Sequence, residues 1–70
     1  MNMVPVQSTS IAFVGYKPET FTLRIVFREG GTYDYHDVPE ITVQQFLSSP
    51  SKGKYYIHWI KGRFNPVRIQ

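Results

Sequence analysis

Two stretches in the first half of the chain have the apolar pattern of β-strands. Residues 10–16, SIAFVGY, are apolar and rich in β-branched and aromatic side chains, and turn residues follow them. In residues 21–28, FTLRIVFR, Phe21 and every second residue after it are apolar, which is the period of two expected when a sheet buries one face. Arg24 and Arg28 then share the opposite face.

A third stretch extends this pattern into a meander. Gly30 and Gly31 tolerate positive φ, so we expect residues 32–36, TYDYH, to return antiparallel to the preceding strand. Residues 67–69, VRI, predict a short additional strand at a sheet edge. The sequence therefore predicts three strands in succession and a fourth near the end of the chain.

Helical spacing replaces alternation after the third strand. Val43, Phe46 and Leu47 stand at i, i+3 and i+4 and form one apolar stripe for packing on the sheet. Asp37 or a neighbouring residue is the expected cap of this helix, and Pro39 is expected in its first turn.

A second helix follows the first. Pro50 ends the first helix because the residue before a proline avoids the α region, and Ser51 is the expected cap of a helix that runs from about Lys52. The apolar side of the second helix repeats every four residues, at Tyr56, Ile60 and Phe64. All elements together predict one α+β domain over residues 1–70, with a small three- to four-stranded antiparallel meander and two helices packed on one face.

The length and composition restrict the class of protein. A chain of 70 residues buries only about 60% of its unfolded surface, so we expect self-association into a homo-oligomer to support its small core. The absence of cysteine excludes disulfides, thiolate metal ligands and a cysteine nucleophile. The first residues lack the regions of a signal peptide, and no apolar stretch approaches the roughly 18 residues of a membrane span. We therefore expect a cytoplasmic protein without membrane contact.

The positive charge is concentrated near one end of the chain. The net charge is +3, but residues 1–50 hold three basic against five acidic residues, a net of −2. Residues 51–70 hold five basic residues and no acidic one. This segment is either a solvated surface that keeps the domain in solution or a face that binds anions.

The start of the second helix combines the groups found at anion sites on helix termini. Ser51 offers a hydroxyl, Lys52 and Lys54 offer ammonium groups, and Gly53 lets a ligand approach the backbone. Each lysine there costs roughly 0.3–1 kcal/mol unless an anion is bound, because it stands at the positive end of the helix dipole. These four residues are a candidate phosphate site. In the alternative interpretation, Ser51 only caps the helix and Gly53 only permits close packing.

Other basic and aromatic residues extend this candidate site. Arg24 and Arg28 are candidates for further phosphate contacts, and Tyr55 and Trp59 are candidates for stacking on a base. In the alternative interpretation, the tyrosines are core residues whose hydroxyl reaches solvent. The remaining cations of the last segment form a candidate basic surface of Lys61, Arg63 and Arg68.

The side chains give little support to catalysis or metal binding. The two imidazoles, His36 and His58, lie in different predicted elements, and no spacing singles out a nucleophile with a base. Two histidines without cysteine form no coordination motif. We expect both histidines at the surface, no catalytic residue, no metal, no cofactor and therefore no enzyme.

A succession of short motifs covers most of the chain: Val6, Ser8, Thr9 and Ile11; Gly15 and Tyr16; Leu23, Ile25 and Phe27; Gly31, Tyr33 and Tyr35; Val38 and Pro39; and Ser51, Gly53, Tyr55 and Tyr56. This succession resembles the KTSC domain, a family named after a C-terminal extension of some lysyl-tRNA synthetases and found mostly as free-standing bacterial and phage proteins. The resemblance runs from about residue 6 to residue 69, and Thr9, Lys17 and Ile57 replace a serine, an acidic residue and an asparagine of the family pattern. It implies a domain type and, from the company that the family keeps, nucleic-acid binding.

Three functions fit these observations. The first is a non-catalytic binder of phosphate-bearing nucleotide ligands, most concretely a phage-type sponge that sequesters a small or cyclic nucleotide immune signal in the host cytoplasm, by analogy with small phage proteins. Its site would lie at an oligomer interface, because a fold of this size encloses little by itself. The second is a nucleic-acid-binding module that uses the basic C-terminal face. The third is a structural or protein-interaction subunit.

Overall fold

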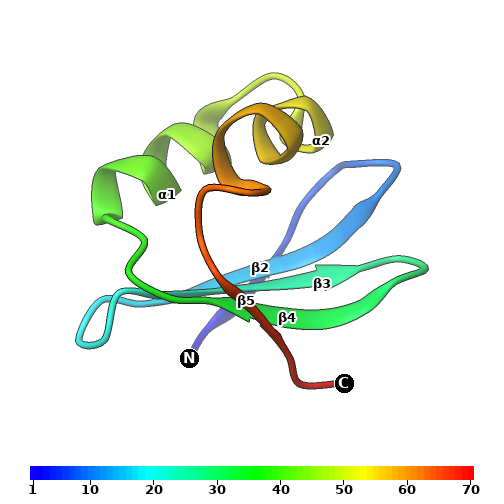
Figure 1. Ribbon diagram of the computed structural model, residues 1–70. Helices are drawn as coiled ribbons and strands as arrows, with labels where there is room; N and C mark the ends of the chain where they lie inside the picture. The colour runs from blue at the N-terminus through cyan, green and yellow to red at the C-terminus, as the bar shows by residue number, and fades with distance from the viewer.

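The computed structural model describes residues 1–70 as one antiparallel sheet with two short helices on one of its faces (Figure 1). The strand order is β1-β2-β3-β4-β5, so each strand pairs with its neighbours in sequence. Both termini lie on the side of the sheet away from the helices. The elements are β1 (Met3–Pro5), β2 (Ile11–Lys17), β3 (Thr22–Phe27), β4 (Gly31–Tyr35), α1 (Glu40–Ser48), α2 (Lys52–Tyr55), the π-helical turn η1 (Tyr56–Ile60) and β5 (Pro66–Arg68).

The predicted α+β class and meander are confirmed, but the sheet has five strands rather than three or four. The strand that the sequence did not indicate is β1, which pairs with β2 from Met3 opposite Gly15 onward. Three residues are too few for alternation to be recognised. The short last strand predicted at residues 67–69 forms one residue earlier, at Pro66–Arg68, and pairs with β4.

A β-bulge in β2 directs its apolar side chains to the helix side. The register between β2 and β3 shifts between Ile11 and Phe13, which leaves Ala12 as the extra residue. Ile11 and Val14 are therefore both buried in the core although they are three residues apart. Strict alternation would place one of them on the opposite face.

The core lies between the sheet and the helices. One expected member, Phe21, lies outside it: this residue precedes β3, has a φ of 54° and is 53% exposed. The left-handed backbone removes Phe21 from the alternation of the strand, and its carbonyl oxygen accepts a hydrogen bond from the Val38 N–H at 2.9 Å. The nine buried core residues are Ile11, Val14, Leu23, Ile25, Tyr35, Val38, Val43, Phe46 and Ile60.

The start of α1 differs from the prediction. Pro39 occupies the N-cap position rather than the first turn, and no side chain caps the helix. Asp37, the predicted cap, has a φ of 62° and belongs to the preceding turn. The apolar stripe is confirmed for Val43 and Phe46, which are buried, whereas Leu47 is 39% exposed.

The second helix begins as predicted and then widens. Ser51 is the N-cap of α2, and its Oγ accepts a hydrogen bond from the Lys54 N–H at 3.3 Å. The chain continues as a π-helical turn, η1, which the Lys61 N–H closes by donating to the Tyr56 carbonyl oxygen at 2.8 Å. An apolar repeat of four residues does not distinguish this wide turn from an α-helix. Neither helix has the length and apolar character that crossing a lipid bilayer would require.

Two tyrosine hydroxyls connect η1 to the sheet. Tyr35 in β4 is buried, and its hydroxyl is 2.7 Å from the Tyr56 hydroxyl, while the two rings meet edge to face at 5.9 Å. Burial, and then the hydrogen bond to Tyr56, raise the pKa of Tyr35 well above its ordinary value. The buried hydroxyl is therefore held neutral by its surroundings.

Candidate functional site

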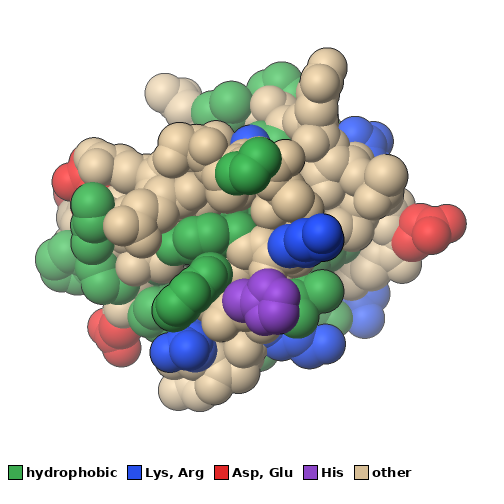
Figure 2. Space-filling view, turned by 90° about the horizontal axis from the view of Figure 1, so that it is seen from above, with side chains coloured by type: hydrophobic (Ala, Val, Ile, Leu, Met, Phe, Trp, Pro, Cys, Tyr) green, Lys and Arg blue, Asp and Glu red, His purple; other side chains and the backbone are tan.

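A cavity of about 240 Å³ lies where the loop after α1 enters α2, and we call it the helix-side cavity. Figure 2 looks down on the helix layer, where basic side chains and a histidine lie among hydrophobic ones and the acidic side chains lie toward the periphery. Ser49 and Pro50 contribute the loop wall of the cavity. The residues from the helix are Ser51, Lys54, Tyr55, His58 and Trp59, so none of the lining side chains is acidic.

Ser51 and Lys54 form the polar end of the helix-side cavity. The Ser51 hydroxyl accepts the Lys54 N–H at 3.3 Å and remains partly exposed. The Lys54 side chain is exposed, and the chain's one ion pair lies elsewhere, between Arg24 and Asp34. An ammonium and a hydroxyl at the start of a helix are suited to a phosphate oxygen. This part of the predicted site is brought together in the structure.

Lys52 and Gly53 do not line this cavity. The Lys52 Nζ turns back along the chain and donates a hydrogen bond to the Ser49 carbonyl oxygen at 2.7 Å. Gly53 packs against the loop before β2, because a Cβ at this position would lie 3.1 Å from the Ser10 Oγ. The alternative interpretation of Gly53 as a close-packing residue therefore agrees with the structure, and of the four residues of the predicted phosphate site only Ser51 and Lys54 line this cavity.

Tyr55 and Trp59 lie side by side at the aromatic end of the cavity, with ring centroids 6.5 Å apart. Tyr55 is mainly a packing residue: its ring stacks on Phe46 at 5.5 Å, and its hydroxyl donates to the Thr42 carbonyl oxygen at 3.3 Å. Trp59 is 53% exposed, whereas Tyr55 is only partly exposed. The Arg63 guanidinium lies over the indole at 5.0 Å and covers part of it. Trp59 is therefore the more accessible of the two rings, and a ligand that stacks on it would share the indole with Arg63 or displace it.

His58 is a lining residue that the sequence interpretation placed only on the helix surface. It follows Lys54 by four residues, a spacing that puts two side chains on the same side of a helix. This spacing is the feature of the sequence from which the position of His58 beside Lys54 could have been predicted. The π-helical turn also leaves Ile57, His58 and Trp59 exposed in succession.

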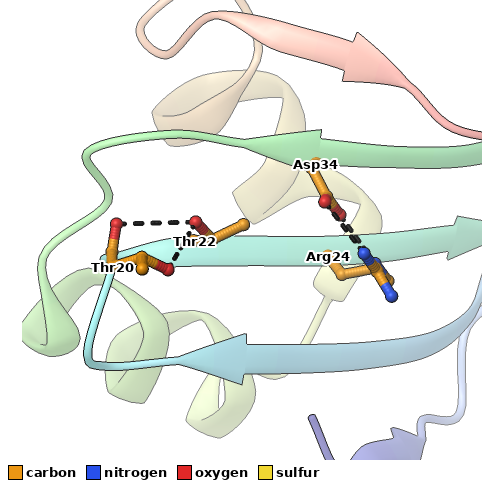
Figure 3. Close-up of polar contacts among 4 residues, drawn as sticks. All are labelled: Thr20, Thr22, Arg24 and Asp34. Atoms are coloured by element: carbon orange, nitrogen blue, oxygen red, sulfur yellow. Dashed lines mark hydrogen bonds and ion pairs between the residues drawn. The ribbon is translucent and has the colours of Figure 1, made fainter.

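Arg24 does not belong to the candidate site. It lies on the face of the sheet that the helices leave uncovered, where its Nε and Nη2 donate to both carboxylate oxygens of Asp34 at 2.7 and 3.0 Å (Figure 3). The hydrogen bond to Asp34 raises the pKa of the Arg24 guanidinium. The structure therefore does not bring Arg24 to the helix-side cavity: it lies on the other face of the sheet, and Asp34 takes its Nε and Nη2 donors.

Arg28 lines a separate cavity of about 260 Å³ at the end of β3. Its Nε donates to the Ser8 carbonyl oxygen at 2.7 Å, and Glu29 also lines this cavity. Arg28 therefore fastens the loop before β2 and does not join Ser51 and Lys54 at the helix-side cavity.

The three cations of the predicted basic surface have different surroundings. Lys61 is exposed just after η1. The Arg63 Nε donates to the His58 carbonyl oxygen at 3.2 Å, which holds this side chain next to the cavity. Arg68 lies on β5, where it covers the Tyr33 ring at 5.8 Å. Lys61 and Arg63 therefore lie close to the helix end, whereas Arg68 belongs to the sheet.

Ionisable side chains do not cluster elsewhere in the chain. No three histidine, cysteine, aspartate or glutamate side chains come close enough to hold a metal ion. His36 is exposed after β4, and His58 is exposed in η1, so both histidines lie at the surface as expected.

The chain is similar to several known proteins. The sequence model of a family described as the KTSC domain matches residues 7–64. A lysine–tRNA ligase of Nostoc sp. is 41% identical over 49 residues, which are 70% of this chain and 9% of that enzyme, so the chain spans only a small part of such relatives. A protein of Tsukamurella paurometabola is 34% identical over 96% of this chain and 100% of its own length. The crystal structure of a KTSC domain protein from Yersinia pestis matches with a TM-score of 0.97 and 43% identity, over 99% of this chain and 97% of that one.

Proposed function

Since the chain belongs to the KTSC domain family and its helix-side cavity joins a cation to an accessible indole, we propose that it is a non-catalytic binder of phosphate-bearing nucleotide ligands. A phosphate would bind at Lys54 and Ser51, and the base would stack at Trp59. The observation that carries this proposal is the convergence of these three side chains in one cavity without an acidic side chain.

The size of the cavity bears on the form that such binding would take. Its volume of about 240 Å³ is below the roughly 300–1,000 Å³ of pockets that enclose a small ligand. One copy therefore covers only part of a nucleotide, and a second copy could supply the missing wall. This argument supports the concrete form of the proposal, a phage-type sponge that sequesters a small or cyclic nucleotide signal between copies of the chain.

The test is calorimetric titration with cyclic mononucleotides, cyclic dinucleotides and ADP-ribose, at about 50 and 200 mM salt. We expect one small nucleotide to bind at both salt concentrations. Lys54→Ala removes a charge-assisted hydrogen bond of about 1.5–3 kcal/mol and should weaken binding at least tenfold. Trp59→Ala removes a stacking contact of about 1–3 kcal/mol.

Lys61→Ala is the matched control, because it removes the same charge from an exposed position that does not line the cavity. It should leave the affinity of the small nucleotide nearly unchanged. Equal losses with Lys54→Ala and Lys61→Ala would argue against a defined phosphate site in the cavity, and unchanged affinity in both Lys54→Ala and Trp59→Ala would remove it.

A second candidate function is binding of a nucleic acid, which the similarity to lysine–tRNA ligases favours. Here Lys54, Lys61 and Arg63 would contact successive phosphates along the helix end. Binding of oligonucleotides would then fall steeply with salt, and each lysine variant would weaken it by a similar factor and reduce the salt slope. If neither nucleotides nor oligonucleotides bind, the third candidate, a structural or protein-interaction subunit, is favoured.

A further inference from the structure

No helix covers the face of the sheet opposite α1 and α2 (Figure 1), although the Met1 and Met3 side chains lie over Gly15, which is buried. The register defines which side chains point to it. Gly15, Arg24, Asp34 and Val67 form one row across β2, β3, β4 and β5. Phe13, Val26 and Thr32 form the neighbouring row. We call this surface the open sheet face.

The open sheet face carries more apolar side chains than is usual for a sheet face in contact with water. An antiparallel sheet with one buried face normally carries polar residues on the other. Here Phe13 is 42% exposed and Val67 is 49% exposed, and Ile69, which follows Val67 at the alternating position, is 41% exposed. The Met3 side chain adds to this surface, because its Sδ lies against Gly15. Phe13 adjoins Val26 on β3, and Val67 adjoins Ile69, so two apolar groups flank the centre of the face. Grouped exposed apolar side chains mark interaction surfaces.

Its charges balance, which restricts the kind of partner. Arg24 and Asp34 stand near the centre of the open sheet face and neutralise each other through two hydrogen bonds of 2.7 and 3.0 Å (Figure 3). The exposed cations Lys54 and Lys61 belong to the helix layer. A nucleic acid requires a positive surface, which the face does not offer. Two copies of a positively charged chain can approach through this neutral face, because their unpaired lysines then point away from each other.

The edges of the sheet are poor alternatives for association. The edge strands β1 and β5 have three residues each and contain Pro5 and Pro66, respectively. Short edges with proline resist the addition of a further strand. The face is broader than either edge: the molecule measures 28 × 25 × 24 Å, so the outline of no side exceeds about 700 Å². Stable interfaces bury about 800 Å² per partner. The whole open sheet face would therefore be needed for a stable dimer.

We propose that the chain forms a homodimer in which the open sheet faces of two copies pack against each other about a two-fold axis. The Arg24 and Asp34 pairs then lie near the two-fold axis, Phe13 on β2 and Val67 and Ile69 at β5 flank them, and the two sheets lie about 10 Å apart as in a β-sandwich. This proposal does not depend on nucleotide binding. The two helix-side cavities lie on opposite outer sides of such a dimer, so this interface does not supply the missing wall of the nucleotide site; a nucleotide held between copies would need a second contact through the helix layers.

Sedimentation equilibrium of the purified chain between about 5 and 200 µM tests the proposal. A dimer whose Kd lies in or below this range of concentrations is then populated. We expect the mass of a dimer for the natural sequence and the mass of a monomer for Phe13→Lys and for Val67→Lys. Ile57→Lys is the matched control: Ile57 is 59% exposed in the helix layer, and the variant should stay dimeric. Far-ultraviolet circular dichroism verifies that each variant is folded.

Phe13→Lys and Val67→Lys both alter the open sheet face, so the test still gives an answer if one of these two variants does not fold. Val67 lies on a three-residue edge strand, where a substitution perturbs the sheet less than at Phe13 in β2. A monomeric natural sequence at 200 µM would overturn the proposal. Dimers that persist in the folded sheet variants, or that dissociate only in Ile57→Lys, would overturn the assignment of the face. The nucleotide titration is a separate measurement, so failure of the dimer leaves the proposed function standing.

Discussion

The hydrogen bond between the hydroxyls of Tyr35 and Tyr56 can be removed from either side, and the loss of unfolding free energy should depend on which hydroxyl is removed. The oxygen atoms are 2.7 Å apart, and Tyr35 is 2% exposed, whereas Tyr56 is only partly buried. Tyr56→Phe leaves the Tyr35 hydroxyl buried without this partner, which costs about 1–3 kcal/mol of unfolding free energy. Tyr35→Phe leaves a hydroxyl that water can reach, so its cost should be about 0.5–1.5 kcal/mol.

The double variant decides whether this explanation is correct. When both hydroxyls are removed, no buried polar group is left unpaired, so the double variant should lose clearly less than the sum of the single losses. Urea unfolding followed by circular dichroism at pH 7 gives the three free energies. A change of 1 kcal/mol also shifts the melting temperature by roughly 4–8 °C in a domain of this size. Strictly additive losses, or no loss with Tyr56→Phe, would refute the reasoning.

The same pair predicts a dependence of stability on alkaline pH. Burial and the bond to Tyr56 raise the pKa of Tyr35 above the ordinary value of 10.0. The folded state therefore binds the phenolic proton more tightly than the unfolded state does. The contribution of the Tyr35 hydroxyl to the free energy of unfolding is complete below about pH 10 and is lost as the pH rises above that value. Tyr35→Phe should make stability fall less steeply above pH 10. An equally steep fall in this variant would contradict the assignment.

Four further substitutions test other parts of the structure, each by urea unfolding. Gly31→Ala should cost more than Gly62→Ala: both glycines have positive φ, which costs about 1–2 kcal/mol for alanine, but only at Gly31 would the added Cβ collide with the chain. Arg24→Ala leaves the Asp34 carboxylate, whose side chain is 13% exposed, without its partner, so it should cost about 1–3 kcal/mol, and the calorimetric titration should show an unchanged nucleotide affinity. Phe46→Ala empties a fully buried position, and its cost of about 3–5 kcal/mol should largely unfold the domain at 37 °C.

Local patterns in the sequence determined most of the secondary structure. The alternation around Leu23 and Ile25, the helical spacing of Val43 and Phe46, and the cap at Ser51 each depend on residues only a few positions apart. Those elements formed nearly where they were predicted. The order of strands followed as well, because short connections make successive strands neighbours. The resemblance to a family rested on the same local motifs, and the match over residues 7–64 agrees with it.

The candidate site depended on contacts that no local pattern records. Arg24 and Lys54 look alike in the sequence, but the strand register gives Arg24 a carboxylate partner and leaves Lys54 exposed at the helix-side cavity. Gly53 was predicted as a ligand contact, but in the structure it packs against Ser10.

The bulge at Ala12 and the wide turn of η1 are also decided by packing across the core. The reason is physical: a strand or helix can form from its own residues, but the partner of a charge and the lining of a cavity come from segments that only the tertiary structure brings together.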